Sequence, residues 1–485
     1  MPASGLDSLD FSALASDATD PAIALRLVAP DAFSAFRAEA DPDMRALIDA
    51  RGLSGKGGEA LLLPGDRARP PLAVGLLEPA EKGSHVLLEC AARIAEALPA
   101  GSYRLEPAPE TAIVRLFALG WLLAHYRFRR YFSNGQDKAP PLRRLLMADA
   151  AMRETVVREA EAVALVRDLV NMPANDMQPS ALEAAMRDLA ARHGAAVEAI
   201  VGDDLLEKNL PAIHTVGRAA ADAPRLVDLR WGDPEAPRVT LVGKGVCFDS
   251  GGLDIKSASG MRLMKKDMGG AAHAMGLAHM IMAAGLPLRL RVLVPAVENA
   301  VGAGAFRPGD IIATRKGLSV EIGNTDAEGR LILADALALA DEETPELLLD
   351  FATLTGAARV ALGPDLPALF TPDDALAQAC LAAGQAQGDP LWRLPLWQPY
   401  RDDLQSSVAD LLNASESGFA GAVTAALFLE SFIANARAWA HVDLFAWNKS
   451  ARPGRPAGGE AMAIRAFFHM IAGWLEHRGT GRGRR

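Results

Sequence analysis

From about residue 180 onward, short apolar runs alternate with segments in which apolar residues recur at helical spacing. Helical spacing indicates helices, whereas short apolar runs between turn residues indicate buried strands. Helices are predicted at 181–193, 267–284 and 427–438, and strands at 196–201, 225–231, 239–246, 288–297, 347–354 and 442–446. Strands that alternate with helices are typical of an α/β sheet covered by helices on both faces.

The first part of the chain gives weaker signals. Short apolar runs alternate there with Pro- and Gly-bearing turns, as in a small α/β domain. A helix is predicted at 111–132, and a longer one, charged on one side, at 147–169, just before Pro173, which cannot continue a helix. We interpret the longer helix as a linker. The predicted units are an N-terminal α/β domain at 1–145, the linker helix at 146–170 and a larger α/β domain at 171–485.

Residues 324–331 read Asn-Thr-Asp-Ala-Glu-Gly-Arg-Leu and form the most unusual stretch. A strand is predicted before them at 318–322 and a helix after them, so Asp326 and Glu328 stand where a strand passes into a helix, a usual place for a site in α/β proteins. Two carboxylates on a short loop supply the hard oxygen ligands that divalent cations prefer. The alternative is an acidic turn at a helix start, where Asp and Glu are favoured.

A second unusual stretch begins at Lys244, which closes an apolar strand between two glycines. Asp249 opens a Gly-rich loop that also holds Lys256, and Asp267 stands at a predicted helix start. Taken singly, these residues are explained as an ion pair, a surface charge and a helix cap. Four carboxylates that converge at one sheet would repel one another, however, and two divalent metal ions would neutralise them. None of the nine histidines lies in these motifs, which argues against an imidazole-rich zinc site.

Composition narrows the class of protein. Half of the 485 residues are hydrophobic, enough for a large core divided over two or three domains. Three scattered cysteines, Cys90, Cys247 and Cys380, favour a reducing cytosol over a disulfide framework. The first charged residues are acidic, unlike a secretory signal, and no apolar run is long enough to span a bilayer. We therefore expect a soluble, cytoplasmic protein without a membrane partner.

Two segments raise the question of nucleic-acid binding. Basic and aromatic residues interleave at 125–132, and the tail from His477 carries Arg478, Arg482, Arg484 and Arg485. Such segments can stack on a nucleic acid and neutralise it. The net charge of −10 favours the alternative, in which the aromatic rings pack inward and the tail is solvated and disordered. We therefore do not expect a nucleic-acid partner.

The acidic and lysine motifs resemble those of the leucine aminopeptidases, cytosolic exopeptidases that use two metal ions. Residues 324–331 match the signature of that family in full, and 244–252 and 256–271 match it with the same intervals between them. Residues 294–299, 351–357 and 441–443 are also similar. The resemblance covers about 115–470 and fades over the first hundred residues. Ser257 departs from it, since the family usually has Pro after the catalytic lysine.

The resemblance implies a macro-like N-terminal α/β domain, a linker helix and a catalytic domain with a mixed sheet flanked by helices, assembled as a homo-hexamer. It implies an aminopeptidase that hydrolyses the N-terminal residue of peptides, Leu or another apolar residue preferred, by attack of a metal-activated water. The implied cofactors are two divalent ions, Mn²⁺ or Zn²⁺, with bicarbonate possible at Arg330.

The resemblance also assigns roles by position. One metal ion would be held by Lys244, Asp249, Asp267 and Glu328, and the more exchangeable one by Asp249, Asp326 and Glu328. Lys256 would polarise the scissile carbonyl, and the bicarbonate at Arg330 would act as general base. The pocket for the first side chain would be shaped by Met264, Thr353 and Gly356. Two alternatives stay open: a two-metal phosphoesterase, since such sites also serve phosphoryl transfer, and a nucleic-acid-binding or scaffold role.

Overall fold

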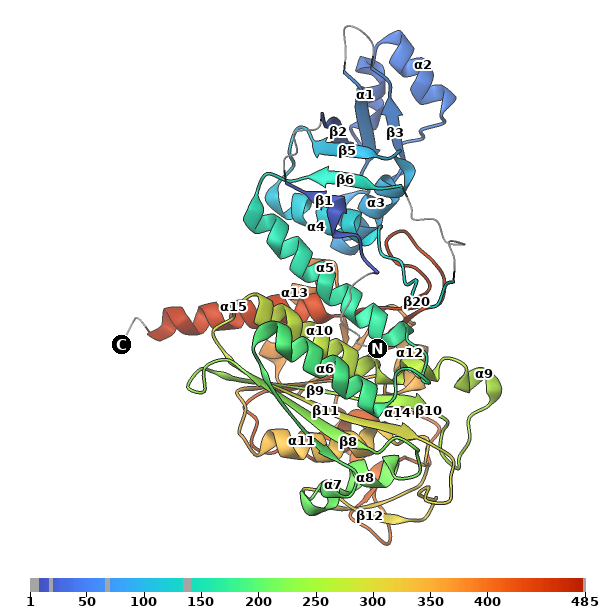
Figure 1. The fold of residues 1–485 in the computed structure, drawn as a ribbon, viewed down its shortest axis with the longest axis vertical. Helices are drawn as coiled ribbons and strands as arrows, with labels where there is room; N and C mark the ends of the chain where they lie inside the picture. The colour runs from blue at the N-terminus through green and yellow to red at the C-terminus, as the bar shows by residue number, and fades with distance from the viewer. Residues whose placement is uncertain (1–7, 17–20, 66–69, 134–140, 483–485) are drawn as a thin grey trace.

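The computed structural model describes residues 8–16, 21–65, 70–133 and 141–482. Two α/β units lie one above the other along the long axis of the molecule, and the long helix α5 (Ala150–Asn171) runs between them (Figure 1). The predicted fold class, a small N-terminal α/β unit followed by a larger one with a mixed sheet, is confirmed. Within the described ranges, no helix is both long and apolar enough to cross a membrane.

The N-terminal unit is built on a six-stranded sheet. In spatial order its strands are β1 (Leu14–Ala15), β6 (Arg143–Leu146), β5 (Gly101–Leu105), β2 (Ile23–Val28), β4 (Leu72–Leu76) and β3 (Ala60–Leu63). Only β3 is antiparallel to its neighbour among these described strands. The helices of this unit are α1 (Phe33–Glu39), α2 (Pro42–Ala50), α3 (Ser84–Ala97) and α4 (Thr111–Leu123). Ile94 of α3 and Phe117 of α4 are fully buried in one core with residues of the sheet, such as Leu25.

The larger unit contains a nine-stranded mixed sheet. In spatial order its strands are β16 (Trp392–Arg393), β15 (Ala368–Phe370), β18 (Trp439–Asp443), β14 (Leu347–Ala352), β9 (Arg238–Gly243), β11 (Arg289–Asn299), β8 (Arg225–Trp231) and β7 (Ala196–Val201). A further strand, β10 (Gly245–Asp249), continues beyond β9 and pairs with β11. The central strands β18, β14, β9 and β11 are parallel, so their carboxyl ends meet at one edge.

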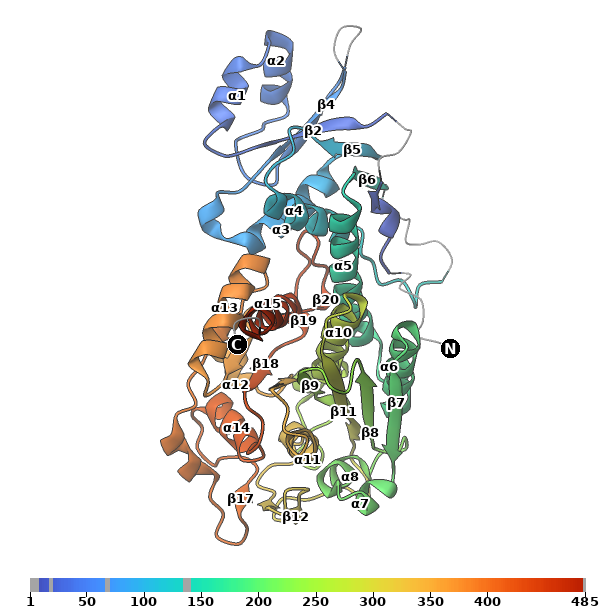
Figure 2. The same cartoon turned by 90° about the vertical axis from the view of Figure 1, so that its left-hand side faces the viewer.

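Helices cover both faces of this sheet, as the sequence predicted. One face carries α5, α6 (Pro179–His193), α10 (Gly269–Ala283) and α15 (Ile464–Arg482), and the other carries α8 (Pro211–Gly217), α11 (Gly329–Asp341) and α14 (Gly421–Glu430). In Figure 1, α6 and α10 lie above the sheet and α8 and α11 below it. The shorter or peripheral helices are α7 (Asp204–Glu207), α9 (Ala258–Met261), α12 (Gly356–Leu362) and α13 (Asp374–Gln387). Helix α13 lies beside α15 (Figure 2).

Two small sheets complete the unit. One contains β12 (Ile311–Ala313), β13 (Ser319–Glu321) and β17 (Leu411–Leu412), and the other pairs β19 (Trp447–Asn448) with β20 (Gly458–Gly459). The strand predicted at 318–322 is β13, so it does not belong to the main sheet, and the expectation that all four carboxylates sit on one sheet is wrong for Asp326 and Glu328.

Two predicted helices end earlier than their apolar pattern suggests, and the residues that follow each helix are hydrogen-bonded to a carboxylate that is distant in sequence. The helix predicted at 111–132 stops at Leu123, and Tyr126 then donates a hydrogen bond to Asp168 of α5 at 2.7 Å. The helix predicted at 427–438 overlaps α14 only at 427–430, since α14 begins at Gly421 and ends at Glu430. Beyond it, Asp341 accepts hydrogen bonds from the backbone N–H groups of residues 434–436.

The two basic segments also differ from expectation. Tyr126 is buried as predicted, but Tyr131 and Phe132 are exposed. The tail predicted as disordered is helical up to Arg482 in α15, and Arg478 pairs there with Glu346 and lies 4.8 Å from the ring of Trp474. Arg484 and Arg485 lie outside the described residues.

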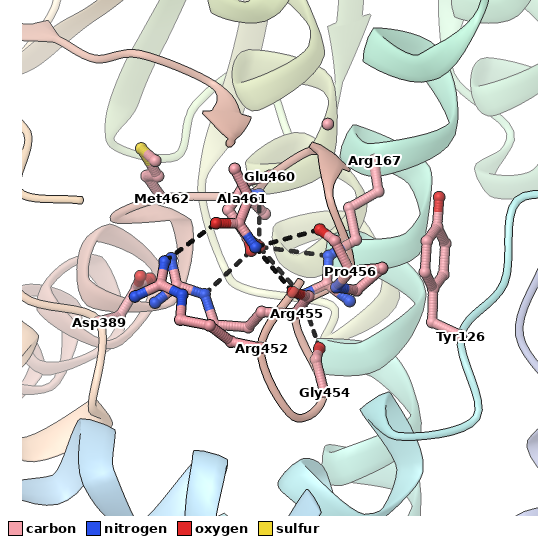
Figure 3. Close-up of polar contacts among 12 residues, drawn as sticks. Tyr126, Arg167, Asp389, Arg452, Gly454, Arg455, Pro456, Glu460, Ala461 and Met462 are labelled. Carbon is pink, nitrogen blue, oxygen red and sulfur yellow. Dashed lines mark hydrogen bonds and ion pairs between the residues drawn. The ribbon is translucent and has the colours of Figure 1, made fainter. Parts of the chain in front are cut away.

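A buried ion cluster fastens α5 to the loop that precedes α15 (Figure 3). Arg167 of α5 donates to Glu460 at 3.0 Å and to the Gly454 carbonyl at 3.0 Å, and its guanidinium lies 5.1 Å from the ring of Tyr126. Arg455 donates to the second oxygen of Glu460 at 2.9 Å. The Arg167 and Glu460 side chains are 1% and 3% exposed, so this contact is shielded from water and salt.

Candidate metal centre

The candidate residues come from four segments that meet at the carboxyl edge of the central strands. Lys244 is the single residue between β9 and β10, and Asp249 ends β10. Asp267 lies in the short 3₁₀ helix η3 (Met264–Met268), directly before α10. Asp326 and Glu328 precede α11, whose N-terminal end carries partial positive charge that stabilises nearby carboxylates.

Two ammonium groups lie among these carboxylates. Lys244 Nζ is 2.7 Å from Asp267 Oδ2 and 2.9 Å from Glu328 Oε1. Lys256 Nζ is 2.8 Å from Asp249 Oδ2 and also pairs with Asp326. Burial lowers the pKa of Lys244, but the Asp267 and Glu328 carboxylates outweigh it and raise that pKa above its usual value. The site is therefore a buried network of opposite charges.

The carboxylates fit divalent cations. Asp249, Asp326 and Glu328 each offer one oxygen, and the three oxygens lie within 4.8 Å of one another. Glu328 Oε2 is buried and accepts no hydrogen bond from the described residues. Burial and the Asp249 carboxylate raise the pKa of Glu328 to about 8 and that of Asp326 to about 6. Three carboxylates this close together repel one another unless cations neutralise them. Their oxygens are the ligands that hard divalent metal ions prefer.

Neighbouring polar groups fix the carboxylates in place. Thr353 Oγ1 donates to Asp267 Oδ1 at 2.8 Å, and Asn299 Nδ2 donates to Asp249 Oδ1 at 2.8 Å. Partners of this kind orient metal-binding side chains. Sequence reasoning noted residues 294–299 only as similar to the family. The signal for the contact is the parallel register, which pairs Asp249 with Asn299 at the ends of β10 and β11.

Arg330 is buried in the first turn of α11, two residues after Glu328. Its Nη1 donates to the Asn413 carbonyl at 2.6 Å, whereas its Nε is buried and donates no hydrogen bond within the described part of the chain. Burial lowers the pKa of Arg330 to about 10, so the guanidinium remains charged at neutral pH. The arrangement leaves one donor of a buried cation available to an anion.

One cavity of about 560 Å³ joins these groups. Its walls include nearly all the residues that the sequence singled out: Lys244, Asp249, Lys256, Met264, Asp267, Asp326, Arg330, Thr353 and Gly356. Glu328 is the exception, since it lies behind the cavity wall beside Lys244. Sequence reasoning missed Lys266, Arg359 and Phe445, which also line the cavity. The adjacent lysines before Asp267 were the only local signal for Lys266.

Comparison with known proteins shows which family the chain resembles. Residues 164–468 match the model of the cytosol aminopeptidase family, catalytic domain, and residues 23–147 match that of the M17 aminopeptidase N-terminal domain. A probable cytosol aminopeptidase of Geobacter sp. (strain M21) is 39% identical over 449 residues, covering 88% of this chain and 90% of the relative. A probable cytosol aminopeptidase of Roseiflexus castenholzii is 39% identical over 385 residues, covering 76% of this chain and 78% of the relative.

Solved structures are similar over nearly the whole chain. The cytosol aminopeptidase from Coxiella burnetii superposes with a TM-score of 0.88 at 46% identity, covering 96% of this chain and 99% of that one. The bottromycin maturation enzyme BotP in complex with Mn gives a TM-score of 0.83 at 34% identity, covering 93% and 99%. Because the catalytic-domain model spans more than half of the sequence and these relatives match along most of their length, the chain belongs to the cytosol aminopeptidase family (M17) and is a metal-dependent aminopeptidase.

Proposed function

We propose that the chain is a two-metal aminopeptidase that removes single N-terminal residues from peptides. The observation that carries this proposal is the cluster of Asp249, Asp326 and Glu328 oxygens within 4.8 Å, next to two more candidate ligands. Lys244, Asp249, Asp267 and Glu328 would hold one ion, and Asp249, Asp326 and Glu328 the other. The ions would be Mn²⁺ or Zn²⁺; the structure of BotP in complex with Mn supports Mn²⁺. When bound, two such ions supply a nucleophilic water at neutral pH and a Lewis acid for a free α-amine.

The remaining residues would act on the substrate. Lys256 lies in the loop before α9, and its ammonium would stabilise the negative charge that develops on the scissile carbonyl oxygen. Arg330 would hold a bicarbonate as general base; its available Nε donor supports this role. Met264, Thr353 and Gly356 line the same cavity and would shape the pocket for the first side chain.

We extend the proposal to the organisation of the chain. The division into 1–145, 146–170 and 171–485 is supported by the two family matches and by the position of α5. Assembly as a homo-hexamer rests on the resemblance alone, and a cytoplasmic location is supported by the names of the relatives. The resemblance implies Leu or another apolar residue at the N-terminus of the substrate, whereas the charges of the pocket favour a different side chain.

The test is a panel of aminoacyl anilides assayed after reconstitution with manganese, zinc, cobalt or magnesium. We expect turnover that depends on a free α-amine, so the N-acetylated anilides should be inert. Rapid hydrolysis of a blocked substrate would contradict an exopeptidase, and turnover of a phenyl phosphate in place of the anilides would identify a phosphoesterase. A mobility shift with DNA that persists at physiological salt would instead favour the nucleic-acid role.

A further inference from the structure

We propose that the pocket for the first side chain is built for a carboxylate, so that the enzyme prefers substrates with N-terminal Glu or Asp. This inference rests on the proposed function and names its substrate class. It is carried by two cations, Lys266 and Arg359, that lie over one aromatic ring, Phe445, in the wall of the catalytic cavity.

Lys266 is a buried lysine that has no close ion-pair partner among the described residues. It lies in η3, is 4% exposed, and lines the cavity. Its Nζ is 5.2 Å from the centroid of the Phe445 ring. Among the described residues, the one carboxylate within 4.0 Å is Asp267, whose Oδ1 is 3.8 Å away, too far for a hydrogen bond. Buried ammonium groups are normally paired, because an unpaired buried charge is costly.

Arg359 brings a second positive charge to the same ring. It extends from α12, and its guanidinium carbon is 4.7 Å from the centroid of Phe445. In the described part of the chain, no carboxylate lies within ion-pair distance of Arg359. The face of one ring attracts a cation only weakly and cannot neutralise two. The pair therefore presents uncompensated positive charge to the cavity.

Each carboxylate that the described residues contribute to the cavity wall already has a partner of its own. Asp249 and Asp326 face Lys256. Asp443 accepts hydrogen bonds from the Leu354 N–H at 3.0 Å and from the Thr355 hydroxyl at 2.6 Å. Asp267 faces Lys244 at 2.7 Å and is assigned to a metal ion in the proposed function. An incoming carboxylate is what remains to pair with Lys266 and Arg359.

The position of the two cations points to the first side chain of the substrate. Lys266 is two residues after Met264 in η3, and Arg359 lies on the helix that begins at Gly356, the two positions proposed to shape that pocket. A Cβ placed on Gly356 would lie 3.7 Å from Arg359 Nη2, so the guanidinium reaches back over the start of α12. The free carboxylate of a dipeptide carries the same chemistry, but it would enter at the second residue.

The side chains of glutamyl and glutaminyl anilides have nearly the same shape and differ in charge. A comparison of the two substrates therefore isolates the effect of the side-chain charge. With the metal-reconstituted enzyme, we expect kcat/KM for the glutamyl anilide to exceed that for the glutaminyl and leucyl anilides by about 10- to 100-fold, as for a hydrogen bond between charged groups. Lys266→Met should bring the Glu/Gln ratio close to one, and Arg359→Gln, at an exposed position, should lower it. Lys265→Met is the matched control, since Lys265 donates to the Asn171 carbonyl at 2.6 Å outside the cavity and should leave the ratio unchanged.

Calorimetry with free L-glutamate and L-glutamine provides a readout that does not depend on turnover. Tighter binding of glutamate that Lys266→Met abolishes, with metal content retained, supports the inference. Equal binding of the two amino acids, or a Leu or Gln anilide turned over as well as the Glu anilide, overturns it. A third outcome also overturns it: the enzyme prefers leucyl dipeptides to leucyl amide, Lys266→Met removes that preference, and the Glu and Gln anilides do not differ. The two cations would then bind the carboxylate of the substrate's second residue. If no anilide is hydrolysed, the proposed function fails, and glutamate binding decides this inference separately.

Discussion

Gly329 leaves the space that the end of the Lys244 side chain occupies. A Cβ at Gly329 would lie 2.4 Å from Lys244 Cε and 2.6 Å from its Nζ. The Lys244 ammonium is paired with both Asp267 and Glu328, so the side chain cannot move away from a new Cβ without breaking one of these ion pairs. We expect Gly329→Ala to displace Lys244, to cost about 1–3 kcal/mol of unfolding free energy through overpacking, and to lower metal content and activity together. Metal analysis and urea unfolding measure both effects.

Gly473→Ala is the matched control, because no heavy atom of the described residues lies within 4 Å of the position of its Cβ in α15. This change should stabilise the helix by about 0.5–1 kcal/mol and leave metal content unchanged. An active Gly329→Ala enzyme with a full complement of metal would show that Lys244 is not a ligand.

Lys256 should separate metal binding from catalysis. It contacts Asp249 and Asp326 but is not among the proposed ligands. Lys256→Ala should lower kcat by about 10²–10³, the usual effect of losing one donor to a developing negative charge, with little change in KM. Metal content should stay intact, and so should the activity of Lys316→Ala, since Lys316 donates to the Ser431 carbonyl and is not among the residues that line the cavity. Loss of one metal equivalent in Lys256→Ala would mean that the roles of Lys244 and Lys256 have been confused.

His273 gives the catalytic unit a built-in sensitivity to acid. It is fully buried, its Nε2 accepts from the Met462 N–H at 2.9 Å, and its Nδ1 therefore donates to the Gly269 carbonyl at 2.6 Å. Burial lowers the pKa of His273 to about 4, below the ordinary value of 6.5. The unfolded chain thus takes up the proton first, and stability is lost as the pH falls from about 6.5 towards 4, by roughly 3 kcal/mol in full.

The measurement is urea unfolding at several pH values with a chelator present, so that metal release does not contribute. His273→Gln keeps an amide donor and acceptor without a titratable ring. It should lose less unfolding free energy than the parent chain between pH 7 and pH 4.5. Parallel pH profiles for the two proteins would contradict the assignment of this acid sensitivity to His273.

The buried Glu460 carboxylate forms ion pairs with two arginines, Arg167 and Arg455. Glu460→Gln would leave both cations without their carboxylate and should cost about 3–5 kcal/mol of unfolding free energy. Asp49→Asn is the comparison at the surface: the Arg37–Asp49 pair is 47% and 46% exposed, and its loss should leave the unfolding midpoint nearly unchanged. Similar shifts in the two variants would show that burial does not decide the strength of these pairs.

Local periodicity predicted the elements whose ends are set locally. Strands β7 and β8 were predicted with their observed bounds, and α6 and α10 to within two residues at each end. Two of the failures, α4 and α14, involve contacts that are distant in sequence: after α4 the Arg127 N–H donates to the Ser8 carbonyl, and after α14 the Ala436 N–H donates to Asp341.

The candidate site was likewise predicted only in part, because some of its residues stand in sequence motifs and others are brought together only by the fold. Asp249, Asp267, Asp326 and Glu328 stand in recognisable motifs, so the sequence alone was enough to expect that they converge. The convergence of Lys266, Arg359 and Phe445 could not be expected in this way: Lys266 lies in the motif at 256–271 but was not singled out there, and Arg359 and Phe445 follow the similar stretches at 351–357 and 441–443 without belonging to them. The sequence also could not predict that β13 belongs to the small three-stranded sheet, because the apolar pattern of a short strand does not indicate which strands pair with it.

The pairing of Arg167 with Glu460 has a consequence for how the protein is made. The two residues are 293 positions apart. At 5–20 residues per second, a ribosome needs roughly 15–60 s to add the second after the first. During that interval α5 carries an arginine whose buried partner has not yet been synthesised. The N-terminal unit, whose strands all precede residue 147, can fold while translation continues, whereas the buried contact between Arg167 and Glu460 forms only after the loop with Glu460 has emerged.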